Sequence, residues 1–464
     1  MLPIFKNCYD LDKRCYSEYG LSEDILMENA ARGVSTFISQ KYPKKSLLVV
    51  AGVGNNGADG IAVARQLHGK CKVKLFLPFE PKSSMAKLQL LRAQKVGVKI
   101  VNSIKKSDII LDAIFGAGLC KPLDDTYSTL IQQLNQCKAI KIACDIPTGI
   151  FENGAIDSVA FKADYTLTMG AHKEALYSDK ASDFVGKIKC VDLGVSQKVY
   201  AQSSEHFLLQ KKDFKPPLRM SNASHKGDFG HLNILAGQKQ GAAILSAMSA
   251  MKFGTGLVTL VTNEAIDIPF YLMKDTHLSA NCNAIAVGMG LGNEFLDSFL
   301  EKEVVQKQTP VLLDADALSN KVLLQILEQK ERDIVFTPHP KEFCKLLSYF
   351  SQSIDIQTLQ NNRFEYAKEF SLNFPHIVLV LKGANTIIAH SGKLFVNPFY
   401  SNTLSQAGSG DILSGLIAAL LAQGYNPCEA AISGSLALSF IAKKHKGSNY
   451  SASADDLINA LGHL

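Results

Sequence analysis

The stretch 407–415, AGSGDILSG, contains residue types that could act on a phosphoryl group. Glycines on both sides of Ser409 allow a tight turn whose free backbone N–H groups open an apolar helix predicted from Ile412 onward. Such N–H groups bind anions, and Asp411 at the rim could take a proton from a hydroxyl that attacks a phosphoryl group. From this stretch alone, an aspartate that caps a helix after a glycine turn is an equally good interpretation.

Three further loops in the first half of the chain, AGVGNNGADG, DAIFGAGLCKPLDD and DIPTG, each follow an apolar run. Asp112 and Asp145 stand at predicted strand ends, and Asn56 and Thr148 add hard oxygen donors. Together these side chains could hold a cation or a sugar-phosphate while one carboxylate does acid/base work. Each acid alone could merely cap a turn, and the residues by themselves leave these choices open.

The apolar runs around these loops predict the scaffold that positions them. LLVVAG, KVKLFL, DIILDAIF, AIKIACDI, ADYTLTM and KIKCVD alternate with helical patterns, which is typical of a doubly wound α/β domain. Ligands in such sheets bind beyond the carboxyl ends of the strands, where the three loops lie. Ahead of them, apolar residues at helical spacing from Leu21 to Ile38, with Ser22 as the N-cap, predict a helix.

The second half repeats this organisation after a polar segment, 201–219, which is the predicted linker. HLNILAG, GLVTLV, NAIAVGMGLG, PVLLDADAL, DIVFTPHP and HIVLVLKGANTIIA predict a second, mainly parallel sheet. Polar residues at the ends of these strands, such as Asp314, His339 and Lys382, suit a nucleotide cleft along one sheet edge. His339 between two prolines is, by itself, more typical of a turn. The sequence contains no Walker A motif, which excludes a P-loop kinase.

Composition narrows the class of protein. The chain has 464 residues, of which 47% are hydrophobic, and a formal net charge of +6 without any Lys/Arg block, so we expect two globular domains and no nucleic-acid partner. The ten cysteines occur singly and without metal-ligand spacing, which indicates a reduced, cytoplasmic protein. No segment has the pattern of a signal peptide or a membrane span, so we expect no membrane partner.

The ordered motifs together resemble those of the bifunctional NAD(P)H-hydrate repair enzymes, in which an NAD(P)HX epimerase domain is fused to an ADP/ATP-dependent NAD(P)HX dehydratase domain. The resemblance covers nearly the whole chain and rests on NNGADG, DAIFGAGL, DIPTG, HKGDFGHLNILAG, LDADAL, TPHPKEF, LKGANTIIA and AGSGDILSG. It implies a Rossmann-like, doubly wound epimerase domain at residues 1–205 and a ribokinase-like α/β dehydratase domain at residues 206–464. The implied reactions are epimerisation of (R)- and (S)-NAD(P)HX, and nucleotide-dependent dehydration of (S)-NAD(P)HX through phosphorylation of its hydroxyl and loss of phosphate.

The resemblance also implies roles for individual residues. Asp145 and Asp411 would be the catalytic residues, and a potassium ion would be held by Asn56, Asp112 and Thr148. The first domain would bind the hydrate through Asn55, Asn56, Gly57, Ala58, Asp59, Gly116, Ala117, Gly118, Leu119, Cys120, Lys121, Pro122 and Asp145. In the second domain, Ala242, Gly290, His339 and Asp411 would contact the hydrate, and Lys382, Gly383, Ala384, Asn385, Thr386 and Gly410 would hold the adenine nucleotide. The implied small molecules are NADHX, NADPHX, ADP or ATP with Mg²⁺, and we expect a homo-oligomer.

The sequence departs from the family pattern at Ala58 and Lys341, where glycine is common, and at Ser405 and Gln406, where small residues are common. Three other interpretations stay open: a ribokinase-like vitamin or thiazole kinase, a non-catalytic module like those of RNA decapping proteins, and a plain NAD-binding dehydrogenase. The complete loops of the first domain disfavour the vitamin or thiazole kinase. The two aspartates at strand ends of the first domain, Asp112 and Asp145, disfavour the non-catalytic module. The first glycine loop does not fit the dinucleotide fingerprint, which disfavours the dehydrogenase.

Overall fold

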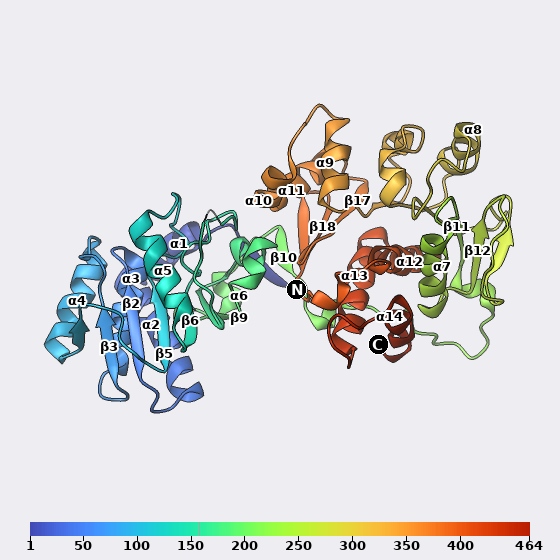
Figure 1. Ribbon diagram of the computed structural model, residues 1–464. Coiled ribbons are helices and arrows are strands. Elements are labelled where there is room, and N and C mark those ends of the chain that lie inside the picture. The colour runs from blue at the N-terminus through green and yellow to red at the C-terminus, as the bar shows by residue number, and fades with distance from the viewer. Residues whose placement is uncertain (157) are drawn as a thin grey trace. The chain divides into compact units, whose positions relative to one another are not determined.

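A computed structural model describes residues 1–156 and 158–464, and it divides the chain into two compact units (Figure 1). Pro3–Ser204 with Gln360–Asn362 form what we call the N-terminal unit. Met1–Leu2, Glu205–Leu359 and Arg363–Leu464 form the C-terminal unit. Among the described residues, no helix combines the length and the apolar composition that crossing a membrane requires.

The N-terminal unit is built on a parallel sheet with the strand order β4-β3-β2-β5-β6-β7-β9. Its strands are β2 (Leu47–Ala51), β3 (Val73–Phe76), β4 (Lys99–Val101), β5 (Ile109–Ala113), β6 (Ile140–Cys144), β7 (Tyr165–Met169) and β9 (Lys187–Val191). Two residues of β1 (Leu2–Phe5) pair in parallel with β8 (His172–Lys173) outside this sheet. The six runs predicted as strands in this half are therefore all strands.

Helices cover both faces of this sheet, which explains why its central strands are continuously apolar. Leu47 and Val49 of β2 pack in one hydrophobic cluster, whereas Leu48 and Val50 pack in another on the opposite face. The helices are α1 (Tyr9–Tyr19), α2 (Glu23–Lys41), α3 (Asn55–Leu67), α4 (Ser84–Val96), α5 (Asp125–Gln136) and α6 (Gln197–Tyr200). The predicted helix with its N-cap is α2, because the Ser22 side chain accepts a hydrogen bond from the backbone N of Ile25.

The C-terminal unit contains a longer sheet in which the strands run β13-β12-β11-β14-β15-β16-β17-β18-β19-β10. Their bounds are β10 (His206–Leu208), β11 (His231–Leu235), β12 (Leu257–Val261), β13 (Met273–Asp275), β14 (Ala284–Val287), β15 (Val311–Leu313), β16 (Ile334–Phe336), β17 (Ile377–Leu381), β18 (Thr386–His390) and β19 (Lys393–Asn397). The pairings are parallel except β17 with β18 and β18 with β19, which are antiparallel. The expected mainly parallel sheet is present.

The helices of this unit are α7 (Gln240–Lys252), α8 (Asp297–Leu300), α9 (Pro340–Ser348), α11 (Arg363–Asn373), α12 (Ser409–Ala422), α13 (Pro427–Lys444) and α14 (Ala454–Ala460), together with α10 (Ile356–Asn361) as far as Leu359. Side chains of α7, α12, α13 and α14 share one hydrophobic core with the inner strands. Figure 1 shows these four helices close together. Helix α12 is buried over almost its whole length from Ile412 onward, so its first turn has a fixed position against the sheet.

Three details differ from the sequence-based expectations. The predicted linker contains a strand, β10, which pairs in parallel with β19 and which no local pattern reveals, because its partner is distant in sequence. The run HIVLVLKGANTIIA is a hairpin of two strands rather than one strand. Helix α12 begins at Ser409 instead of Ile412, and its N-cap is Gly408, which has a φ of +90°. Asp411 therefore lies in the first turn of the helix and does not cap it.

Candidate active sites

Asp112 and Thr148, from two of the three loops of the N-terminal unit, are joined directly. The hydroxyl of Thr148 donates to Oδ1 of Asp112 over 2.8 Å, and the backbone N of Thr148 donates to Oδ2 over 2.8 Å. The backbone N of Ile114 also donates to Oδ1. Burial raises the pKa of Asp112 to about 6, although these hydrogen bonds act in the opposite direction. Asp112 therefore fixes the DIPTG loop to the end of β5.

Asn56, in the first turn of α3, meets the other two loops at Gly116. A Cβ atom at Gly116 would lie 3.1 Å from Oδ1 of Asn56 and 3.2 Å from Oδ2 of Asp145, so only glycine leaves this space open. Within the described residues, neither the oxygen nor the nitrogen of the buried Asn56 amide has a hydrogen-bond partner. Buried amides are normally paired, so this one indicates the position of a ligand.

Asp145 itself is held by four donors. Its Oδ1 accepts from Nζ of Lys173 over 2.6 Å and from the hydroxyl of Thr168 and the backbone N of Met169, each over 3.1 Å. Its Oδ2 accepts from the backbone N of Ala117 over 3.3 Å. Burial acts to raise the pKa of Asp145, but Lys173 and the other donors outweigh it and hold the pKa below its ordinary value. The backbone of Asp145 has a φ of +69°, which few residues other than glycine adopt.

Lys173 is the residue that sequence reasoning missed in this site. It is 2% exposed and lies on β8, just beyond the end of β7. Burial lowers the pKa of its ammonium group, but Asp145 more than compensates and the pKa lies above its ordinary value. The available signal was only that Lys173 follows the predicted strand ADYTLTM, at the same sheet edge as the loops, and its neighbours His172 and Glu174 are polar as well.

The remaining predicted residues of this unit fall into three groups. Asn55 and Asp59 line a cavity of about 120 Å³ together with Asp12, Tyr16 and Glu23, and burial, then the nearby Asp145, raises the pKa of Asp59 well above its ordinary value. Gly57, Ala58 and Leu119 are buried in packing, and a Cβ at Gly57 would lie 2.0 Å from a backbone oxygen. Gly118, Cys120, Lys121 and Pro122 are exposed.

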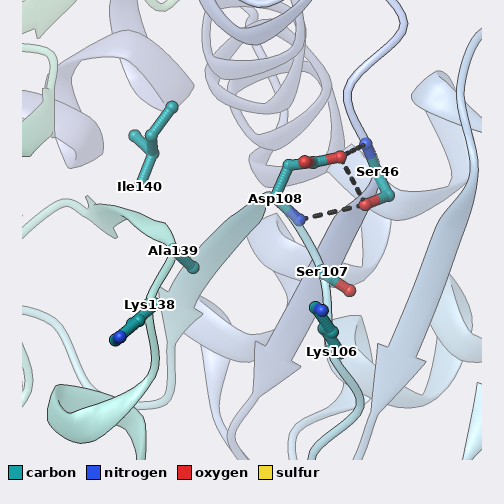
Figure 2. Close-up of a pocket in the computed structure, with 7 residues that line it drawn as sticks. All are labelled: Ser46, Lys106, Ser107, Asp108, Lys138, Ala139 and Ile140. Atoms are coloured by element: carbon teal, nitrogen blue, oxygen red, sulfur yellow. Dashed lines mark hydrogen bonds between the residues drawn. The ribbon is translucent and has the colours of Figure 1, made fainter.

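A larger hollow of the N-terminal unit lies elsewhere. It has a volume of about 560 Å³ and is lined by Ser46, Lys106, Ser107, Asp108, Lys138, Ala139 and Ile140 (Figure 2). These residues precede or begin β2, β5 and β6, so the hollow lies at the amino ends of the strands. The carboxylate of Asp108 already accepts hydrogen bonds there from the backbone N and the hydroxyl of Ser46 (Figure 2). None of the predicted site residues lines this hollow.

In the C-terminal unit, Lys382 connects several strand ends. Its Nζ lies 2.7 Å from Oδ1 of Asp314, and its backbone N donates to the backbone O of Pro338 over 2.9 Å. Oδ2 of the same aspartate accepts from the hydroxyl of Ser414 over 2.7 Å. A Cβ atom at Gly410 would lie 3.6 Å from Nζ of Lys382, so this ammonium reaches the start of α12. The ends of β15, β16 and β17 and the N-terminus of α12 thus meet around the ammonium group of Lys382.

Asp411 lies in the first turn of α12, next to this pair. Within the described part of the chain, no group donates a hydrogen bond to its carboxylate, while its backbone O accepts from the hydroxyl of Ser246 on α7. Burial raises the pKa of Asp411, Asp314 raises it further, and Lys382 lowers it less than these two raise it. A partly buried, unpaired carboxylate with a raised pKa is a good proton acceptor.

His339 is the N-cap of α9. Its Nδ1 accepts from the backbone N of Lys341 and of Glu342, and Glu342 accepts in return from the backbone N of His339 over 2.8 Å. Oε2 of Glu342 also lies 4.0 Å from Nζ of Lys382. Sequence reasoning missed Glu342, although the spacing of a cap residue and a glutamate three positions later indicates a capping box.

The other predicted residues of the C-terminal unit lie in two places. Ala242 and Gly290 come together through Lys239, whose backbone N donates to the O of Gly290 and whose O accepts from the N of Ala242. Gly383, Ala384 and Asn385 form the turn of the β17–β18 hairpin, and Thr386 begins β18. The structure thus brings Lys382, Gly410 and Asp411 together, and Ala242 with Gly290.

The two folds and their sites define a fused α/β enzyme with one carboxylate-centred site in each unit. A family model described as YjeF-related protein N-terminus matches residues 23–175, and one described as NAD(P)H-hydrate dehydratase matches residues 232–462. The bifunctional NAD(P)H-hydrate repair enzyme Nnr of Helicobacter pylori is 40% identical and covers 100% of both chains. The enzyme of the same name from Dictyoglomus turgidum is 33% identical over 97% of this chain and 95% of its own. The chain belongs to the family of bifunctional NAD(P)H-hydrate repair enzymes.

The family, the bifunctional enzyme and the pairing of a Rossmann-like with a ribokinase-like α/β domain are therefore confirmed as the sequence motifs predicted them. Among solved structures, the ADP/ATP-dependent NAD(P)H-hydrate dehydratase from Bacillus subtilis, co-crystallized with ATP/Mg²⁺, is 28% identical. It covers 53% of this chain and 92% of its own, with a TM-score of 0.45.

Proposed function

We propose that residues 1–205 interconvert (R)- and (S)-NAD(P)HX, and that residues 206–464 dehydrate (S)-NAD(P)HX to NAD(P)H with ADP or ATP. The observation that carries this proposal is the pair of carboxylates, Asp145 and Asp411, each at a sheet edge where glycine loops converge. We further propose a cytoplasmic homo-oligomer that acts on small molecules.

The epimerase proposal follows from the chemistry of the hydrated ring. Its C6 carries both a hydroxyl and the ring nitrogen, so the configuration is lost when the bond from C6 to nitrogen opens to an aldehyde. Asp145 accepts the hydroxyl proton as this bond opens, and the bonding electrons pass to the ring nitrogen and into the conjugated carboxamide. When the nitrogen attacks the other face of the aldehyde, Asp145 returns the proton to the oxygen at C6. Oδ2 is the oxygen available for this step, because Oδ1 already has three donors. The partnerless amide of Asn56, across Gly116, would bind the same substrate or its cation.

Asn56, Asp112 and Thr148 fit a potassium ion by the chemistry of their donors. An amide oxygen, a carboxylate and a hydroxyl are the hard oxygen ligands that such a cation takes, and the amide has no other described partner. Bound there, the ion would supply a fixed positive charge at the junction of the loops. Asp112 and Thr148 already lie together, while Asn56 would complete the set.

In the dehydratase proposal, Asp411 takes the proton from the C6 hydroxyl as that oxygen attacks the terminal phosphoryl group of the nucleotide. Phosphate then leaves C6 with the bonding electrons, assisted by the lone pair of the ring nitrogen, and loss of a ring proton restores the dihydronicotinamide. Ala242, Gly290 and His339 would contact the hydrate. Hydroxide would be a much poorer leaving group, which explains the need for a nucleotide.

The nucleotide would be held by the backbone around the N-terminus of α12 and by the hairpin turn, through Lys382, Gly383, Ala384, Asn385, Thr386 and Gly410. Lys382 lies beside Gly410, which supports this assignment. Mg²⁺ would be carried mainly by the nucleotide phosphates, and the carboxylate of Glu342, 4.0 Å from Nζ of Lys382, is an acid that could contact it. When bound, it would neutralise charge on the transferring phosphoryl group.

The proposal is tested by mixing the protein with both epimers of NADHX or NADPHX, magnesium and either ADP or ATP, and following the absorbance of the reduced nucleotide. Complete conversion of both epimers is expected. Conversion of one epimer only would remove the epimerase assignment, and accumulation of a stable phosphorylated product would make the C-terminal unit an ordinary kinase.

A further inference from the structure

The most unusual charged group of the N-terminal unit is the ammonium of Lys173. Its three hydrogen bonds go to Oδ1 of Asp145, to the hydroxyl of Thr168 over 3.1 Å and to the backbone O of Met169 over 2.5 Å. Lys173 is only 2% exposed, and a buried ammonium persists only where such partners surround it. Every one of its protons is thereby committed to one cluster around Asp145.

We propose that Lys173 is a positioning residue for epimerisation, which holds Oδ1 of Asp145 so that the side chain stays a carboxylate and presents Oδ2 to the substrate loop. This inference rests on the proposed epimerase function. The contact of Oδ2 with the backbone N of Ala117, inside the loop GAGL, fixes the direction in which the free lone pairs of that oxygen point. Neither Lys173 nor its partners belongs to the expected potassium ligands.

The surroundings of Asp145 explain why a cation is needed there. Among the described residues, the titratable groups other than Lys173 that interact with Asp145 are acidic or neutral: Cys8, Tyr9, Asp12, Asp59 and Cys144. They come from the start of the chain, α1, α3 and β6, so the carboxylate is enclosed by groups that disfavour a second negative charge. Without the ammonium, burial and these acids would both favour the protonated form of Asp145.

A proton acceptor works only in its deprotonated form, so the sign of the effect is fixed. Activity that needs the carboxylate is present above the pKa of Asp145 and is lost as the pH falls through it. Replacement of Lys173 raises this pKa and moves the acidic limb of the epimerisation profile to higher pH. An opposite charge at such a distance shifts a carboxyl pKa by about one to three units, so a shift of that size is expected.

The experiment compares wild type with Lys173→Met, which keeps the length of the side chain and removes its charge. Epimerisation is followed against pH by the slow phase of NADHX repair, with excess separate dehydratase. The Asp145 carboxyl is titrated in parallel by NMR with ¹³C-labelled aspartate, assigned with Asp145→Asn. The expected result is an acidic limb and a carboxyl titration that both move up by about one to three pH units, with partial recovery of rate at high pH.

Lys187→Met is the matched control, because it removes the same charge from an exposed position on β9. It should leave both curves in place. If Lys173→Met does not fold, Thr168→Val removes another donor from the same oxygen and should produce a smaller shift in the same direction.

Each outcome decides a different point. A rate that falls by the same factor at every pH, with an unchanged Asp145 titration, would show that Lys173 is merely structural and would overturn the inference. The other outcome is that wild type shows no epimerisation, while Lys173→Met still moves the titration of the Asp145 carboxyl. Lys173 would then keep its effect on Asp145, and the proposed epimerase function would be wrong.

Discussion

Both units contain a lysine–aspartate ion pair at the proposed catalytic site, but only in the N-terminal unit does the pair include the catalytic carboxylate. In the N-terminal unit, Lys173 binds Asp145, the proposed proton acceptor itself. In the C-terminal unit, Lys382 binds Asp314, and Asp411 is left without a described donor. Lys173 and the other donors hold the pKa of Asp145 below its ordinary value, whereas burial and then Asp314 raise the pKa of Asp411 by more than Lys382 lowers it.

This difference matches the steps proposed for the two sites. At Asp145 the proton is accepted and then returned, so a carboxylate that is ionised before each reaction and releases the proton readily serves this step. At Asp411 the proton must be taken from an alcohol at the moment of phosphoryl transfer, and a carboxylate with a raised pKa binds that proton more strongly. The position of one lysine thus separates two similar aspartates in their acid–base behaviour.

The largest effect is expected from Asp411→Asn, which keeps the shape of the side chain and removes the proton acceptor. Nucleotide-dependent recovery of NADH should fall by ~10²–10⁴, while epimerisation and thermal unfolding stay as in wild type. The rate is measured at saturating nucleotide. A mutant that turns over normally once saturated would make Asp411 a group that positions the nucleotide.

Asp145→Ala should separate the two activities in the other direction. With mixed epimers and excess nucleotide, the mutant should convert the accepted epimer in a fast phase and then continue only at the rate of uncatalysed epimerisation. Progress curves show the two phases, and a separate epimerase added late should restore completion. If Asp145 only shapes the turn before Pro147, a folded mutant would complete the mixture at the wild-type rate, or both phases would fall together with stability.

Asp112→Ala tests the cation part of the N-terminal site. The change removes a carboxylate with three hydrogen bonds, so binding of the hydrate and the response of epimerisation to potassium salts should both weaken by roughly tenfold or more. Dehydration of the accepted epimer should not change. If the mutant's epimerisation rate is still higher in potassium salts than in sodium salts, Asp112 is not a ligand of the ion.

The smallest effect is expected from Asp314→Asn. Since Asp314 raises the pKa of Asp411, removal of its charge should lower that pKa and move the acidic limb of dehydration to lower pH. The freed Lys382 would lower it further. The pH profile of kcat for dehydration measures this shift, and the epimerisation profile is the internal control. A limb that moves to higher pH would show that Asp411 is not the titrating group.

Much of the fold could be read from the sequence because each strand run was long, apolar and followed by a polar loop. Asp112, Thr148 and Asp145 could be placed at one edge because parallel strands have their carboxyl ends together. Lys173 could not be assigned to Asp145, because the two are 28 positions apart and their contact depends on how the chain returns after β7. Glu342 was hidden for a similar reason, since its approach to Lys382 depends on β16 and β17 being neighbours.

The strand inside the predicted linker has a practical consequence for dissecting the protein. β10 supplies the parallel partner of β19, and the backbone N of Leu209 continues this pairing with the O of Val396. A fragment cut after Leu209 would leave the N–H and C=O groups of β19 unpaired along an apolar edge, and such edges recruit other chains and aggregate. An autonomous C-terminal fragment therefore has to start no later than Glu205, although residues 201–219 look like a dispensable linker in the sequence.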